Sequence, residues 1–560
     1  MPLFQPATVP LGFVQQLGLG LAAIVLISGF AAVASLFFHG GSALLTETSA
    51  IGRITDIVMR AGMQAGLSVF ASLLVAMIAV RSLARCWGRR PARLLAMLCG
   101  IAMVVPTTVA ASGILGLWGF QGLFAQYWRS ATAMLGIETN WPEIYGLGGV
   151  VLAHVFFNAP LMIRVFLPAL LTIPANYHKL ADQFGCTAWQ RFWLLEWPAI
   201  RMAVPALCLL VFLLCFTSFA LVLMLGGGPA VTTLEVEIYA AIRFDFDLQS
   251  AALLSLVQIF IAGLMIMVMA RIGGAAMPLP LADTMPAFEP TTAATKGRFI
   301  SWSGVSDLFV LGMLFLLIAM PLFVILLRGF NPALAEVIGW PVFHDALQRS
   351  VVIALISSLA TLAAGFLLAE SRVRLVGRNH SALLLLDAGM LVYMVIPAVV
   401  LGTAAFILLR GIANPFTLPW LLVPVANILM ALPFVVRLLE ARLYAVYHRH
   451  DRLAASLGIS GGARLRILTL PAMRAQFGIA GGLAAALSIG DLGIIALFAS
   501  QDFQTLPWLL YQTAGRYQAE AASSLASLLM LLTAGCFVFY FYASYLLPGV
   551  QRYRGGFHHA

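Results

Sequence analysis

Charged side chains are scarce in this sequence, and lysine is almost absent. Only 10% of the 560 residues are Asp, Glu, Lys or Arg, whereas a soluble domain usually carries about 25%. Such a chain could not keep its surface hydrated in water. The only lysines, Lys179 and Lys296, follow a histidine and a threonine. A P-loop needs a Gly-Lys-Ser/Thr run, so the sequence contains no ATP-hydrolysing motif of that kind.

Cysteine is also sparse, and its placement argues against metal binding and disulfides. The chain has six cysteines: Cys86, Cys99, Cys186, Cys208, Cys215 and Cys536. No pair has the spacing of metal ligands, and none is expected in an outer loop, where a disulfide could form. We therefore expect free cysteines, no metal site and no bound cofactor.

Apolar residues make up 62% of the chain, in runs long enough to cross a membrane. About 20 apolar residues span the bilayer core, and such runs recur along the whole length. We predict an all-α membrane protein with about twelve spans. The first six are expected at 17–38, 59–80, 94–117, 144–166, 203–225 and 250–270, and the second six at 306–327, 350–369, 382–409, 419–438, 475–498 and 522–546.

The distribution of Lys and Arg predicts the orientation of these spans. Most of the 32 basic residues fall in alternate loops, including the loops at 81–93, 179–201, 372–378 and 437–474. Basic loops stay on the cytoplasmic side of a membrane. Both termini are therefore predicted to be cytoplasmic, and the formal net charge of +10 is a topology signal and not a nucleic-acid footprint.

The two sets of six spans look like repeats of one unit. Residues 158–160 (NAP) and 431–433 (ALP) lie 273 positions apart, and each half later carries a Thr-Leu pair followed by a Tyr. We predict two parallel halves at 1–272 and 305–560, with a pathway between them. The Pro-, Ala- and Thr-rich stretch 273–304 is predicted to be a cytoplasmic linker.

The longest inner loop of each half has the same spacing of small residues, glycine and proline. Residues 179–185 read KLADQFG and 195–198 read LEWP, while 452–458 read RLAASLG and 468–471 read LTLP. The loops, at 174–198 and 447–471, resemble the EAA loop of ABC-importer permeases: Glu-Ala-Ala, three residues, Gly, nine residues, Ile-x-Leu-Pro. The resemblance implies a type I ABC-importer permease fold, which docks on a separate ATPase.

A physical logic fits this resemblance. A short amphipathic helix with small residues can enter a cleft in the ATPase, the Gly permits a sharp turn at its end, and the Pro is tolerated in the first turn of the next helix. ATPase closure would then move the spans. The candidate coupling residues are Ala181, Gly185, Pro198, Ala454, Gly458 and Pro471.

Both loops also depart from the pattern of the family. Lys179-Leu180 and Arg452-Leu453 replace the usual Glu-Ala, and Trp197 stands where Leu is expected. No role of the family's Glu can therefore be carried over. The alternative reading is an ordinary basic loop followed by a helix that starts with proline.

Further stretches are similar to the family of thiamine or thiamine-pyrophosphate importer permeases (ThiP). They include AHVFFNAP at 153–160, CFTSFA at 215–220, GGGP at 226–229, LSIGD at 487–491 and DFQTLP at 502–507. The resemblance covers nearly the whole chain. It implies a permease without enzymatic activity in a bacterial inner membrane, assembled with two ATPase subunits, which use the ATP, and a periplasmic binding protein.

Some polar residues within the apolar runs fit a path for a cation such as thiamine. Asp491 falls inside a predicted span, where a charge is costly and often functional. Ser488, Ser218, His154 and Asn158 occupy comparable positions. The alternative for Asp491 is a carboxylate that only stabilises helix packing, and for His154 and Asn158 it is hydrogen bonding between helices.

The outer loops contain more acidic than basic residues, among them Glu235, Glu237, Asp245 and Asp247. They could help a binding protein to dock, or they could form an ordinary solvated face.

Three other functions compete with a thiamine importer. An ABC permease for ferric iron or another small solute would share the loops. A proton-coupled secondary transporter would also have twelve spans, but the paired loops and the few intramembrane carboxylates argue against it. A membrane-embedded enzyme is the third class, yet the sequence contains no His/Glu metal cluster and no convincing nucleophile–base pair.

Overall fold

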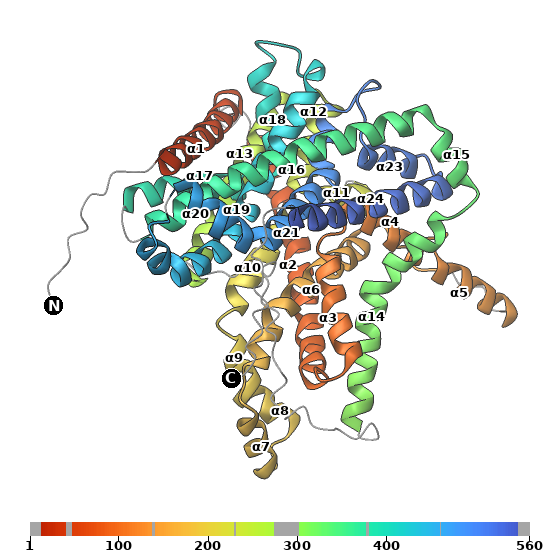
Figure 1. Ribbon diagram of the computed structural model, residues 1–560. Coiled ribbons are helices and arrows are strands. Elements are labelled where there is room, and N and C mark those ends of the chain that lie inside the picture. Colours follow the sequence, from red (N-terminus) through yellow and green to blue (C-terminus); the bar gives the residue numbers. More distant parts are fainter. Residues whose placement is uncertain are drawn as a thin grey trace.

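A computed structural model of the chain describes residues 13–40, 48–136, 141–228, 231–273, 302–376, 380–459 and 461–546, and every element in these ranges is a helix (Figure 1). Within them, ten helices are long and apolar enough to cross a membrane, and up to twelve if each of two bent pairs is one span. The prediction of an all-α protein with many spans is confirmed. Most of the predicted linker, 274–301, lies outside the described residues.

The described residues of the N-terminal part form thirteen α-helices and one π-helical turn: α1 (Phe13–Gly40), α2 (Thr48–Arg85), α3 (Arg90–Ala102), α4 (Thr107–Trp118), α5 (Leu123–Met134), α6 (Leu147–Leu171), α7 (Ala175–Gln183), α8 (Ala188–Arg191), η2 (Phe192–Glu196), α9 (Trp197–Ile200), α10 (Val204–Phe216), α11 (Ala220–Leu225), α12 (Leu234–Arg243) and α13 (Leu248–Gly273).

In the C-terminal part, the residues that the structure describes form eleven α-helices, one short 3₁₀ turn and a second π-helical turn: α14 (Trp302–Gly329), α15 (Ala333–Gly339), α16 (Pro341–Leu375), α17 (His380–Val395), α18 (Ala398–Leu409), η3 (Pro415–Thr417), α19 (Pro419–Ser456), α20 (Gly461–Arg464), η4 (Leu465–Thr469), α21 (Leu470–Ile489), α22 (Gly493–Phe498), α23 (Leu506–Gly515) and α24 (Ala519–Tyr545).

Four of the predicted spans are interrupted, which corrects the uniform spans expected from the sequence. The span at 94–117 is divided into α3 and α4, and the span at 382–409 into α17 and α18, which meet at an angle of 98°. Pro106 and Pro397 cap the second helix of each pair. Proline lacks an N–H and disfavours a helical conformation of the residue before it, so each helix must end before its proline. The spans at 203–225 and 475–498 are interrupted without a proline.

Elements of the two parts recur at a constant separation along the chain. The π-helical turn η4 lies 273 positions after η2, and the short helix α22 lies 273 positions after α11. The last turn before α13 contains Phe246 at φ 55°, and the last turn before α24 contains Tyr517 at φ 59°. These local matches agree with the predicted repeat, while the division into two halves remains a prediction.

The first long helix of each part packs against helices of the other part. Helix α1 contacts α16, α17 and α18, and α14 contacts α4, α3 and α2. Glycines allow the close approach: a Cβ on Gly18 would lie 2.0 Å from Ser371 Oγ, and one on Gly29 would lie 2.2 Å from Val392 Cγ1. Small residues serve this purpose in membrane helices, because association there depends on close packing. Each part therefore packs its first long helix against the other part.

The glycine contact of α1 can be tested by substitution. We expect Gly18→Val to destabilise the protein by about 1–3 kcal/mol, the usual cost of overpacking, because the new side chain would collide with Ser371. Gly20→Val is the matched control, since a Cβ there has no neighbour within 4 Å. The midpoint of thermal unfolding in detergent should fall for the first variant only. Equal midpoints would show that α1 is not seated on α16.

Candidate functional site

The first predicted coupling loop contains a short separate helix that ends in a glycine turn. Helix α7 begins after Pro174, and Gly185 follows it with φ +63°. The amide of Gly185 donates to the carbonyl of Asp182 at 3.0 Å, and the amide of Cys186 donates to that of Ala181 at 2.9 Å. This left-handed C-terminal turn is favourable for glycine because a Cβ is strained there.

The second loop has the same turn at the end of a much longer helix. Gly458 has φ +66°, and the amide of Ile459 donates to the carbonyl of Ala454 at 2.9 Å. The preceding helix is not a separate short one, however: α19 runs without interruption from the apolar region to Ser456. Its 38 residues correspond to about 57 Å, well beyond the roughly 30 Å of a bilayer core. The two coupling loops are therefore attached to the bundle differently.

Both turns present large apolar side chains to the outside while the small residue faces inward. Ala181 and Ala454 are buried, whereas Phe184 is 77% exposed and Leu457 is 64% exposed. These last two residues stand at equivalent positions directly before the glycines. Exposed apolar side chains at the tip of a loop are typical of a protein interaction site.

Pro198 and Pro471 each stand at the second residue of a helix, α9 and α21, which agrees with the expected place in the first turn of the next helix. Each of these helices continues a π-helical turn without a gap: α8, η2 and α9 follow one another directly, as do α20, η4 and α21. A proline inside a helix lacks its N–H and clashes with the preceding turn. The wider π turn accommodates it. The sequence pattern is therefore that of a bulged helix.

Arg81 anchors the first loop to the long helix α2. Its Nε donates to Glu196 at 2.5 Å, and its guanidinium lies over the ring of Phe192 at 4.9 Å from the centroid. Both partners belong to the π-helical turn. Trp189, Trp193 and Trp197 pack edge to face or at a tilt around Phe192 and one another. The turn is thus held by an ion pair and a cluster of aromatic rings.

The second loop is anchored by a different set of residues. Arg464 is paired with Asp451 and lies 4.3 Å from the ring centroid of Tyr447. The hydroxyl of Tyr447 donates to Glu370 of α16, whose carboxylate also pairs with Arg374 at 2.5 Å. Movement of this loop is therefore linked to α16, while the first loop is linked to α2.

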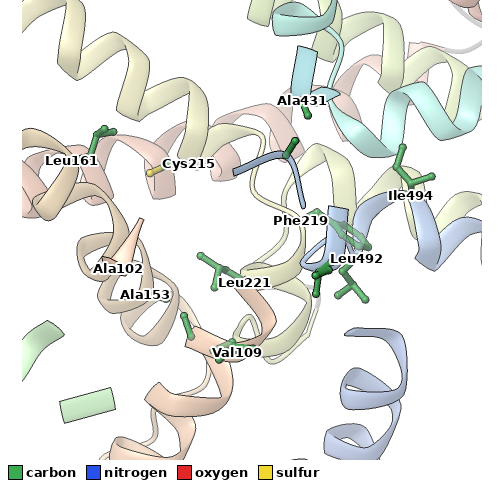
Figure 2. Close-up of a cluster of buried hydrophobic side chains, with 14 of the residues drawn as sticks. Ala102, Val109, Ala153, Leu161, Cys215, Phe219, Leu221, Ala431, Leu492 and Ile494 are labelled. Atoms are coloured by element: carbon green, nitrogen blue, oxygen red, sulfur yellow. The ribbon is translucent and has the colours of Figure 1, made fainter. Parts of the chain in front are cut away.

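The residues predicted for a substrate path divide into two groups. Ser218 and Asp491 lie in the two breaks that have no proline, between α10 and α11 and between α21 and α22, 273 positions apart. Figure 2 shows Phe219 and Leu492, the residue after each of them, in the same buried cluster. The side chain of Asp491 accepts the amide of Ile494 through Oδ1 at 3.3 Å, while Oδ2 is buried and has no partner among the described residues.

The remaining predicted polar residues make hydrogen bonds between helices. Nδ1 of His154 lies 2.9 Å from both Gln64 Nε2 and Ser68 Oγ of α2. Asn158 donates to the sulfur of Cys215 at 3.1 Å, three residues before Ser218, and Ser488 accepts from Asn427 at 2.9 Å. These contacts agree with the packing alternative for His154 and Asn158.

Sequence reasoning missed Glu235, which was placed in an exposed outer loop. The residue is 2% exposed and lies in the first turn of α12. Its helix face includes Ile238 and Tyr239, both buried. That spacing of i, i+3 and i+4 is the signal that could have shown an inward orientation. Glu237, on another face, is half-buried.

Nearly the whole chain is similar to known transport permeases. No family model matches it. The "Thiamine transport system permease protein ThiP" of Brucella suis biovar 1 (strain 1330) is 37% identical over 535 residues, which cover 95% of this chain and 94% of the relative. The protein of the same name from Escherichia coli (strain K12) is 36% identical over 491 residues, or 85% and 86% of the two chains. The "Sulfate transport system permease protein CysT" of E. coli is 26% identical over 166 residues, only 29% of this chain.

The anchor of the first loop leads to a prediction. Removing the ion pair and the cation–π contact of Arg81 by Arg81→Met should destabilise the loop by about 1–2 kcal/mol. Amide hydrogen exchange in residues 175–200 should become about 5–30 times faster, with no change in 448–471. Arg93→Met is the control, because Arg93 is exposed. Unchanged exchange in Arg81→Met would show that the anchor does not hold the loop.

Proposed function

Because this chain belongs to the ThiP family of thiamine transport permeases, we propose that it is the membrane-spanning permease subunit of an ABC importer for thiamine. The single observation that carries the proposal is the 37% identity to such a permease over 95% of the chain. A match of that extent includes both coupling loops and the central breaks. The sulfate permease matches a far smaller part, which favours thiamine over an inorganic anion.

The permease works with a separate motor. Two ATPase subunits bind the two coupling loops from the cytoplasm and use the ATP, and a periplasmic binding protein delivers the substrate. Two features support this: both loops present an exposed apolar residue next to a left-handed glycine, and neither lysine of the chain lies in a P-loop motif. The chain itself is a transport subunit, not an enzyme, and needs no bound cofactor.

The permease lies in the inner membrane of a bacterium, with its coupling loops and both termini in the cytoplasm. ATP is available only there, and the loops with most of the basic residues are the ones that stay on that side. The stretch 273–304 joins the two six-span halves on the same side.

Transport proceeds by alternating access between these halves. Closure of the ATPases displaces the coupling loops. The ion pair of Arg81 and Glu196 transmits the movement of the first loop to α2. The hydrogen bond between Tyr447 and Glu370 transmits the movement of the second loop to α16. The substrate crosses at the central breaks, where Ser218, Asp491 and nearby Ser488 provide polar groups in an otherwise apolar core. His154 and Asn158 hold the helices that surround this path.

An uptake assay tests the function. Cells that carry this permease with the ATPase and binding protein of the same organism should accumulate labelled thiamine, and cells that lack only the permease should not. Thiamine pyrophosphate, ferric iron and sulfate are tested in parallel, because related permeases carry other solutes. Accumulation of iron or sulfate without thiamine would overturn the assignment.

The glycine turns give a second test of the mechanism. Gly185→Val and Gly458→Val should leave the protein in the membrane but reduce thiamine uptake relative to ATP hydrolysis. A left-handed conformation costs a residue with a Cβ about 1–2 kcal/mol, and a β-branched side chain is the stiffest choice. The docking turn should therefore be lost. Gly462→Val is the matched control, because Gly462 lies nearby in a helix with open space around it. Full coupling in both turn variants would contradict the role of the loops.

A further inference from the structure

Glu235 is a buried carboxylate without a basic partner. It is 2% exposed, and its carboxylate accepts a hydrogen bond from Gln258 Nε2 of α13 at 3.3 Å. Among the described residues, no Lys, Arg or His lies within ion-pair distance of it. Burying a carboxylate without a counter-charge is costly. Such a group persists where a function requires it or where a cation visits the site.

Asp491 is the second carboxylate of this region, and it comes from the other part of the chain. It too has no ion-pair partner among the described residues, and its Oδ2 is buried without a hydrogen bond. Helix α12, which carries Glu235, packs against α22, which begins two residues after Asp491. This helix contact brings the two carboxylates into the same region of the bundle. They repel one another when both are ionised, so a cation between them would relieve the repulsion.

Gln258 adds a second unpaired acceptor, which shows that the site lacks hydrogen-bond donors. Its side chain is fully buried, its Nε2 is used by Glu235, and its Oε1 has no partner within the part of the chain that the structure describes. The unpaired groups here are therefore an amide oxygen and a carboxylate oxygen. A buried set of oxygens that can only accept calls for a positively charged ligand and is unsuited to an anion.

Aromatic rings beside the carboxylates favour an organic cation over a metal ion. Tyr239 lies one helical turn after Glu235 and so shares its face of α12. Its ring packs edge to face against Phe219, which follows Ser218, with centroids 5.4 Å apart. Aromatic rings attract organic cations through their faces. The described residues contain no group of three or more His, Cys, Asp and Glu that could hold a metal ion.

We infer that Glu235, Asp491 and Gln258 form a transient binding site for a flat monovalent organic cation between the two parts of the permease. The inference rests on the proposed function, in which this cation is the positively charged thiazolium ring of thiamine. The site attracts the ring as it leaves the binding protein and lowers the cost of carrying its charge through the apolar core. It repels anionic solutes of similar size.

The test compares a cation with a neutral molecule of the same shape. The complete importer, with its ATPase and saturating binding protein, is reconstituted in liposomes. Maximal uptake rates are measured for thiamine and for an isostere whose five-membered ring carries no charge. We expect Glu235→Gln and Asp491→Asn each to lower the thiamine rate about tenfold, equivalent to about 1.4 kcal/mol, and to change the rate of the isostere less than about twofold.

Two further variants separate charge from packing. Glu235→Asp keeps the charge and should recover part of the thiamine rate. Glu237→Gln, on the same helix, removes a carboxylate that faces elsewhere and should have no effect. If Glu235→Gln does not reach the membrane, Gln258→Met provides the second test, because it removes the unpaired oxygen with little change in volume and should also reduce thiamine uptake selectively.

The experiment distinguishes failure of the cation site from failure of the proposed thiamine transport. A wild-type importer that moves thiamine, with variants that retain its rate or lose both compounds equally, would overturn the cation site alone. A wild-type importer that moves no thiamine would overturn the proposed function and this inference with it.

Discussion

The arrangement of this molecule depends on one constraint: where no water is present, every backbone polar group must find a partner in the protein. The breaks at Ser218 and Asp491 leave such groups free in the middle of an apolar core. The hydroxyl of Thr233 donates to the carbonyl of Ser218 at 2.9 Å, and Asp491 accepts the amide of Ile494 at 3.3 Å. Because Thr233 caps α12, the bond that satisfies the first break also holds α12 inside the bundle. The burial of Glu235 follows from it.

Features with a local cause could be predicted from the sequence. A glycine four positions after the second alanine of the motif, at the end of a helix, predicts a sharp turn, and left-handed turns are present at Gly185 and Gly458. Asp491 could be selected because a single carboxylate among apolar residues has few explanations. The family also followed from motifs that are continuous in sequence. In each case the residues that determine the structure lie close to one another in the sequence.

Features that depend on distant contacts could not be predicted in this way. The apolar stretches 203–225 and 475–498 look uninterrupted in the sequence. The hydroxyl of Thr233, which binds the carbonyl of Ser218 at the first break, lies outside the first stretch. The π turn before Pro198 is held by Arg81 of α2, more than a hundred residues away in sequence. Glu235 looked like an outer-loop acid because its partner Gln258 belongs to the next helix. Its amphipathic spacing was the available signal, and it is short.

The difference between the two coupling loops has a mechanical consequence. Helix α19 is a single rod from the core to the glycine turn at Gly458, whereas α6 ends at Leu171 and α7 begins anew at Ala175. A rod transmits torque along its whole length, but a joint of three residues transmits force and loses rotation. Equal forces on both loops would therefore twist one side of the bundle and translate the other. Equal forces on the two loops would then produce unequal movements in the membrane-spanning bundle.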